Sequence, residues 1–223
     1  MQISSEFENR LAPAALPVPK GWGVHLAHWI SDVLSPPLVA IAGLILAAYV
    51  SHSAAAWLWA GLHLMLTIGI PMGYIAYKVR RGEITDMHMR VRQQRIRPML
   101  LTLACAVTTL ALIWIGGASQ VMLLFSIMGV FQIGFLLLVT LRWKISGHGA
   151  AIGSMAVFLF GLFGSTALPV FAAVPLVAWA RLRLNRHDLA QTVAGSLVGI
   201  LFMLLVVYLV SIRCQGFDLY CGS

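Results

Sequence analysis

Three short polar segments of the chain carry residues that could bind and transfer a phosphate group. The first contains Arg90 and, seven residues later, Arg97 followed by proline. Seven residues make nearly two helical turns, so a surface helix over 79–97 would point both guanidinium groups the same way. Arginine binds phosphate oxygens well because its planar fork can donate two parallel hydrogen bonds.

The second segment offers backbone donors and a histidine. Ser146 and Gly147 precede His148 where a helix is expected to begin. The first N–H groups of a helix have no partner within the helix and can bind an anion. This segment could therefore bind an anion.

The third segment adds a second histidine. Five residues separate Arg181 from His187, and three more separate His187 from Gln191. His187 and Gln191 stand at helical spacing and could hydrogen-bond, whereas Asp188 follows His187 directly and on a helix would point elsewhere. Two histidines can act as nucleophile and general acid near neutral pH.

Each segment taken alone has a simpler interpretation. Arginines at the edge of a membrane usually fix topology, and this interpretation is adopted for Arg92, Arg95 and Arg186. A histidine at the start of a helix is commonly an interfacial or capping residue. The argument for chemistry depends on the order, spacing and common side of the three segments.

The charge-free stretches of the chain put the segments on one side. Four stretches contain no Asp, Glu, Lys or Arg: 33–77, 98–141, 145–180 and 189–212. A spanning helix needs about 20 apolar residues, so by length they hold two, two, two and one crossings. An even number of crossings then separates the polar segments, and all three emerge on the same face of a membrane.

The sequence therefore predicts an all-α, polytopic membrane helix bundle with six to seven spanning helices. Residues 1–32 form a polar tail and an interfacial amphipathic helix, in which Trp22, His25 and Trp29 recur at helical spacing. Residues 33–212 form the bundle, and 213–223 form a short tail.

Composition supports a membrane protein and argues against several other classes. The chain of 223 residues is 60% hydrophobic and 10% charged, with a net charge of +8. Its basic residues lie in short loops beside the membrane, which favours lipid headgroups over nucleic acid as partners. No metal-ligand spacing is present, so neither a metal nor another cofactor is predicted. No obligate protein partner is evident.

In order and spacing, the three segments resemble the type 2 phosphatidic acid phosphatase family, which is related to the vanadium haloperoxidases. That family has Lys, six residues, Arg-Pro; then Pro-Ser-Gly-His; then Ser-Arg, five residues, His, three residues, Asp. In this chain the corresponding blocks are Arg90, six residues, Arg97-Pro98; then Ile145-Ser146-Gly147-His148; then Ala180-Arg181, five residues, His187, three residues, Gln191. The resemblance covers residues 90–191.

The resemblance implies a role for each matched residue. His187 would attack phosphorus and form a phosphohistidine, and His148 would protonate the leaving oxygen. The phosphate would be held by Arg90, Arg97, Ser146, Gly147 and Arg181. Gln191 replaces the family's orienting Asp with a neutral amide, which can accept the ring N–H but cannot offset the charge of an imidazolium.

The leading function is metal-independent hydrolysis of a lipid mono- or diphosphate, such as phosphatidylglycerol phosphate, phosphatidate or an isoprenoid phosphate. One alternative is a phospho-headgroup or phosphoryl transferase with the same intermediate and an alcohol acceptor. Another is a non-catalytic protein that binds or moves lipids, an alternative motivated by Gln191.

The distribution of charge predicts the orientation. The face of the polar segments carries 14 of the 15 Lys and Arg residues, and the opposite face carries Arg213 alone. Cytoplasmic loops are enriched in Lys and Arg, so the site is expected at the cytoplasmic face of a cell membrane and the C-terminal tail outside. Cys214 and Cys221 could form a disulfide there, although two free thiols fit their spacing equally well.

Overall fold

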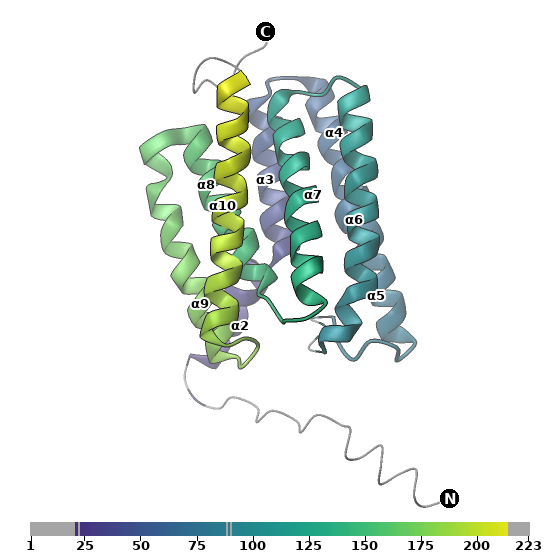
Figure 1. The fold of residues 1–223 in the computed structure, drawn as a ribbon, viewed down its shortest axis with the longest axis vertical. Coiled ribbons are helices and arrows are strands. Elements are labelled where there is room, and N and C mark those ends of the chain that lie inside the picture. Colours follow the sequence, from purple (N-terminus) through teal and green to yellow (C-terminus); the bar gives the residue numbers. More distant parts are fainter. Residues whose placement is uncertain (1–20, 22, 88, 90, 214–223) are drawn as a thin grey trace, which may run out of the picture.

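The regular structure is helical throughout the described residues. The computed structural model describes residues 21, 23–87, 89 and 91–213. Its elements are α2 (Val24–Val33), α3 (Pro36–Val50), α4 (Ala54–Leu64), the π-helix η1 (Met65–Gly69), α5 (Ile70–Arg80), α6 (Arg92–Ile115), α7 (Gln120–Thr140), α8 (Gly147–Phe163), the 3-10 helix η2 (Gly164–Ala172), α9 (Ala173–Arg183) and α10 (Leu189–Arg213). They form one bundle of roughly antiparallel helices (Figure 1), so the all-α prediction is confirmed.

Several of these helices have the length and composition of membrane spans. Within the described residues, five helices qualify, and the bent pair α2–α3 makes a sixth if it is counted as one span. The five are Ala54–Arg80, Arg92–Ile115, Gln120–Thr140, Gly147–Arg183 and Leu189–Leu209. Large apolar side chains such as Leu58, Trp114 and Ile115 face outward, as expected for a surface in contact with lipid. The structure thus gives five to six candidate spans where the sequence predicts six to seven.

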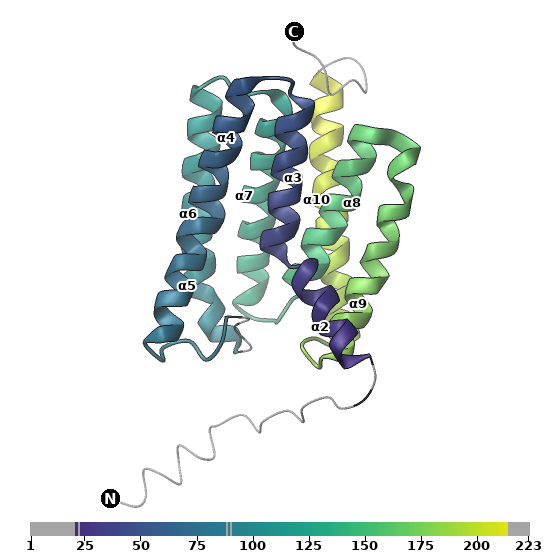
Figure 2. The same cartoon turned by 180° about the vertical axis from the view of Figure 1, so that it is seen from behind.

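The polar segments lie together at one end of this bundle. The loops that join α5 to α6, α7 to α8 and α9 to α10 share that end in both opposite views (Figures 1 and 2). We call it the polar end and define it by residues 81–87, 89, 91, 141–146 and 184–188. The common side predicted from the even number of crossings is therefore confirmed as an arrangement within the bundle.

Three turns lie at the other end. His52, Gly117 and Gly164 have φ angles of 46°, 67° and 61°. This left-handed region costs glycine little, which explains the two glycines. At Gly164 the chain reverses between α8 and η2 (Figure 1), although Gly147–Arg183 is a single stretch in the count of candidate spans.

The prediction of a surface helix over residues 79–97 is wrong. α5 ends at Arg80, the described residues of 81–91 form turns and bends, and α6 begins only at Arg92. Gly82 adopts a φ of 73°, which ends the helical path. Arg92 donates from Nη1 to the carbonyl oxygen of Thr140 at 2.8 Å. This bond satisfies a terminal carbonyl of α7 and fixes the start of α6 beside it.

Close contact between α8 and α10 holds two of the polar loops in place. A Cβ on Gly199 would lie 2.0 Å from the carbonyl oxygen of Ala150, and one on Gly195 would lie 2.3 Å from that of Ser146. Backbone cannot move aside as a flexible side chain can, so these positions require glycine. Gly195 and Gly199 are four residues apart on α10, a spacing that permits such an approach.

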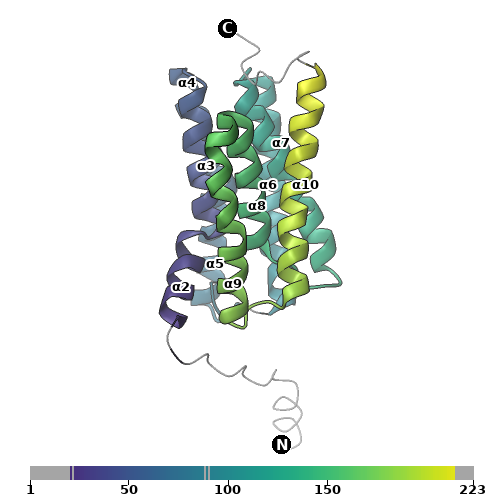
Figure 3. The same ribbon diagram turned by 90° about the vertical axis from the view of Figure 1, so that its left-hand side faces the viewer.

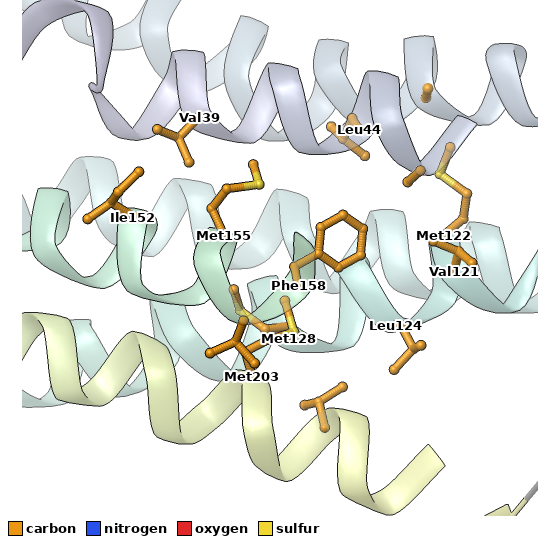
Figure 4. Packing of buried hydrophobic residues seen from close by; sticks show 14 of the residues in the cluster. Val39, Leu44, Val121, Met122, Leu124, Met128, Ile152, Met155, Phe158 and Met203 are labelled. Carbon is orange, nitrogen blue, oxygen red and sulfur yellow. The ribbon is translucent and has the colours of Figure 1, made fainter. Parts of the chain in front are cut away.

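The hydrophobic core lies between α3, α7, α8 and α10. Figure 4 shows Met155 and Phe158 of α8 between α3 and α10. The ring of Phe158 meets that of Phe125 edge to face, with centroids 5.5 Å apart, a favourable aromatic geometry. Leu44 and Met203 are fully buried on either side. This core fixes α8, whose first turn reaches the polar end.

Helix α2 packs against α9 at the polar end (Figure 3). It is bent by 43° from α3. Its inward face buries Ala27, Ile30 and Ser31, whereas Trp29 is 64% exposed. The predicted N-terminal helix is present, and its location at the headgroup level of a membrane stays a prediction.

Candidate functional site

His187 and Gln191 make the hydrogen bond that their spacing predicts. His187 Nδ1 lies 2.9 Å from Gln191 Oε1. The histidine is buried in the loop after α9, while Gln191 lies in the first turn of α10, which begins at Leu189. The pair therefore joins a loop to a helix start and does not share a helical face.

Ser146 connects the second polar segment to the third. Its Oγ accepts a hydrogen bond from the backbone N–H of Gly149 at 3.2 Å and caps α8. Its own N–H donates to the backbone carbonyl of Gln191 at 3.2 Å. Gly147 and His148 follow in the first turn of α8, so their position relative to Gln191 is fixed by backbone contacts.

Ser31 of α2 connects Arg181 and His148. Arg181 Nη1 donates to Ser31 Oγ at 2.7 Å, and both side chains are buried. His148 Nε2 donates to the Ser31 carbonyl oxygen at 3.1 Å. The carbonyl can only accept, so Nε2 of His148 carries a proton. Sequence reasoning missed Ser31, since a lone serine in an apolar helix gives no signal of its own.

These contacts gather most of the predicted site residues at the polar end. We call the group the polar cluster: Ser31, Ser146, His148, Arg181, His187 and Gln191. Its members come from α2, α8, α9, α10 and the loops beside them. Because no one of these elements builds it, the cluster depends on the packing of the bundle.

Arg181 has an unused donor inside the cluster. The residue is 2% exposed, and its Nε is buried with no hydrogen-bond partner among the described residues. An unsatisfied buried donor is costly, and more so on a charged group. A bound anion at this guanidinium would remove that cost.

Further positive charges surround the cluster. Burial lowers the pKa of Lys144 most, and the charges of Arg95, Arg181 and Arg186 lower it further. Like charges that act on one another in this way lie close together. The interpretation of Arg95 and Arg186 as topology signals alone is therefore incomplete, because both contribute to the positive field here.

The same environment keeps the ring of His187 neutral. Burial has the largest effect on its pKa, followed by the positive charge of Arg181. Arg95 and Lys144 act in the same direction, and the hydrogen bond with Gln191 opposes them. The pKa falls to about 3, so at neutral pH one ring nitrogen keeps its lone pair.

The structure does not bring Arg97 into this group. Its side chain is exposed on α6, and its charge acts on Glu83 in the loop before that helix. Arg95 and Arg97 are two residues apart and so point in nearly opposite directions around the helix axis. Arg90 lies outside the described residues. The argument that Arg90 and Arg97 share a helical face fails, since the helix begins after Arg90.

Three comparisons with known proteins gave no match. No model of a known family matches the chain, no curated protein matches it, and no solved structure matches it. Within the described ranges, no three His, Cys, Asp or Glu side chains form a group that could hold a metal ion.

Proposed function

We propose that the protein is a membrane-embedded lipid phosphatase that hydrolyses a lipid mono- or diphosphate through a phosphohistidine at His187. Two lines of reasoning support this function. One is the resemblance to the type 2 phosphatidic acid phosphatase family in the order and spacing of three segments. The other is the polar cluster, in which four residues of those segments, His148, Arg181, His187 and Gln191, lie together.

The observation that carries the proposal is the state of the His187 ring. Nδ1 is engaged by Gln191, so a proton on Nδ1 leaves Nε2 with a lone pair. The buried guanidinium of Arg181 lies near enough for its charge to act on the ring. A neutral imidazole beside a buried cation is the pairing that attack on a phosphate requires, because the cation attracts the phosphate and the ring supplies the electron pair.

The reaction takes two displacements. In the first, the Nε2 lone pair forms a bond to phosphorus while the bond from phosphorus to the lipid oxygen breaks, and His148 gives that oxygen a proton. In the second, water attacks phosphorus while the now neutral His148 takes a proton from that water, and the bond from phosphorus to Nε2 breaks. Inorganic phosphate is released, and both histidines return to their starting states. Nε2 of His148 is engaged by the Ser31 carbonyl, so the proton given to the lipid oxygen would come from Nδ1.

Phosphate binding falls to Arg181 and the start of α8. Nε of Arg181 has no hydrogen-bond partner among the described residues, and the first N–H groups after Ser146 belong to a 17-residue helix whose dipole favours an anion. Lys144 and Arg95 add positive charge without entering the innermost contacts. Transfer of a phosphoryl group depends mainly on such positioning and charge stabilisation.

The polar end suits a lipid substrate. Its loops sit where apolar helices end, so a phosphate could enter the cluster while acyl or isoprenoid chains stay along the outer surface. By the excess of Lys and Arg on this side, we propose that the polar end faces the cytoplasm.

Release of phosphate tests the function. The full-length protein, purified in detergent with a metal chelator, is incubated with phosphatidylglycerol phosphate, phosphatidate and isoprenoid mono- and diphosphates. We expect release from at least one of them and loss of release in His187→Ala. The matched control is His52→Ala, which removes an exposed histidine from the opposite end.

Equal thermal unfolding of both variants would show that the bundle is intact. Activity of His187→Ala near that of wild type would disprove the assigned nucleophile. Products that change when glycerol is added would instead favour the phosphoryl transferase.

A further inference from the structure

Asp188 contacts Gln191 twice at the start of α10. One carboxylate oxygen, Oδ1, accepts the backbone N–H of Gln191 at 2.8 Å. The other, Oδ2, accepts from the side-chain amide, Nε2, of Gln191, also at 2.8 Å. The carboxylate therefore caps the helix and holds the amide at the same time. The expectation that Asp188 points away from the His187 interaction is wrong, because the helix begins after Asp188 and not before His187.

This arrangement determines which way the Gln191 amide faces. Both oxygens of an ionised carboxylate only accept hydrogen bonds. The NH2 group of Gln191 must then face Asp188, and its carbonyl oxygen must face His187. The assignment follows from chemistry and does not depend on which amide atom is labelled oxygen.

The amide in turn determines the state of the ring. A carbonyl oxygen at 2.9 Å from Nδ1 accepts only if Nδ1 carries the proton. Nε2 is then the nitrogen with the lone pair. The direction of hydrogen bonding runs from His187 to Gln191 to Asp188, and reversing one bond would reverse the next.

We propose that Asp188 is a positioning residue that fixes the tautomer of His187 through the side-chain amide of Gln191. The pair would do together what a single carboxylate does in the resembling family: the amide contacts the ring and the carboxylate supplies the negative charge behind it. The catalytic consequence rests on the proposed function, whereas the tautomer itself can be measured without it.

A simple capping role for Asp188 is the competing explanation, and Asp188→Asn separates the two. Asparagine caps helices about as well as aspartate. Its oxygen would still accept the backbone N–H of Gln191, but its NH2 group would face the amide of Gln191. That amide would have to turn over, and its NH2 group would then meet Nδ1 of His187. The ring would shift its proton to Nε2 and lose the nucleophilic lone pair.

The tautomer is read from the nitrogen chemical shifts of full-length protein carrying 15N-labelled histidine, in detergent at pH 7. The signals of His187 are identified by their loss in His187→Ala. We expect a proton on Nδ1 in wild type and on Nε2 in Asp188→Asn. Phosphate release should fall roughly a hundredfold or more, since a catalytic histidine held in the wrong tautomer can lose activity by about 10⁴-fold.

The double variant Asp188→Asn/Gln191→Glu supplies a rescue. It exchanges the amide and the carboxylate without changing net charge or side-chain length. The new carboxylate would accept both from the introduced amide and from Nδ1 of His187, so the wild-type tautomer and most of the activity should return. Glu83→Gln is the control for loss of one carboxylate at the polar end, because Glu83 pairs with Lys78 at 2.5 Å.

The outcomes are distinguishable. A proton that stays on Nδ1 in Asp188→Asn overturns the positioning role, whatever the activity. A shift to Nε2 that reverses in the double variant supports it even if no lipid phosphate is hydrolysed, a result that would count against the proposed function alone. Loss of activity in Asp188→Asn without a change of tautomer would mean that Asp188 acts by a route other than the His187 tautomer, and it contradicts the proposal.

Discussion

Two glycine pairs with the same spacing behave differently in the two halves of the bundle. In α10, Gly195 and Gly199 lie against backbone of α8, and an added Cβ on Gly199 would come within 2.0 Å of it. In η1 and α5, a Cβ added to Gly69 would lie 3.8 Å from the carbonyl oxygen of Leu64. A Cβ added to Gly73 would have no neighbour within 4 Å among the described residues. The same spacing therefore gives close packing in α10 but not at Gly73.

The difference shows which helix contact fixes the geometry of the polar cluster. The α8–α10 contact sets the distance between Ser146 and Gln191 and hence the geometry of the polar cluster. The half formed by α4, η1, α5 and α6 contributes positive charge to that end but none of the cluster's hydrogen bonds described above. We call these four elements the α4–α6 half, and we call α8, η2, α9 and α10 the α8–α10 half.

The largest expected contrast is between two arginines. Arg181→Met should reduce phosphate release by at least roughly 30-fold, since an unpaired charge in a buried ion pair costs ~2–5 kcal/mol. Arg97→Met, an equal change on the exposed face of α6, should reduce it much less. Steady-state release at several substrate concentrations measures both. Equal losses would mean that the α4–α6 half binds the phosphate as directly as α9 does.

The next contrast uses the glycines. Gly199→Ala should destabilise the protein by ~1–3 kcal/mol, because the backbone of Ala150 cannot yield to the added methyl group. Gly73→Ala should be neutral or slightly stabilising, since alanine favours helix and the position is open. Unfolding in detergent, followed by circular dichroism, gives both values. If the two variants unfold alike, the close α8–α10 contact is not what holds this half together.

Much of the fold follows from the pattern of charges, whereas the site follows only in part. Parity alone places the three polar loops at one end, and the turns at Gly117 and Gly164 can be predicted from glycine. The sequence could not show that Arg95, and not Arg97, adds positive charge near the polar cluster. It does not reveal where α6 begins or how that helix is rotated. Ser31 reaches the cluster through the tertiary packing of α2, which no local pattern records.

Two buried serines provide a smaller contrast. Ser31→Ala should lower phosphate release roughly twofold to tenfold, equivalent to ~0.5–1.5 kcal/mol for the lost bond to Arg181. Ser126 in α7 is also buried, with Oγ 3.2 Å from His63 Nδ1. Ser126→Ala should affect stability by a similar amount and leave the rate unchanged. A fall in rate with Ser126→Ala, but not with Ser31→Ala, would place the important polar contact in α7, away from the polar cluster.

The last contrast concerns acid. His187 has a pKa of about 3 when folded and near 6.5 when unfolded. The unfolded chain therefore binds the extra proton first, so the stability from this neutral ring is complete above pH 6.5 and is lost as pH falls toward 3. The unfolding temperature should drop less in His187→Gln than in wild type over this range. If the unfolding temperatures of wild type and His187→Gln fall equally as the pH is lowered, the ring of His187 is not held neutral in the folded protein.

Detection of phosphate on His187 tests the central claim most directly. Full-length protein is mixed with a 32P-labelled lipid phosphate that it hydrolyses, quenched in base within one turnover, and digested for mass spectrometry, since phosphohistidine survives base and decays in acid. The account predicts label on the peptide containing His187, accumulating in wild type and absent in His187→Ala. Steady phosphate release with no label there, or with label on a different residue, would contradict it.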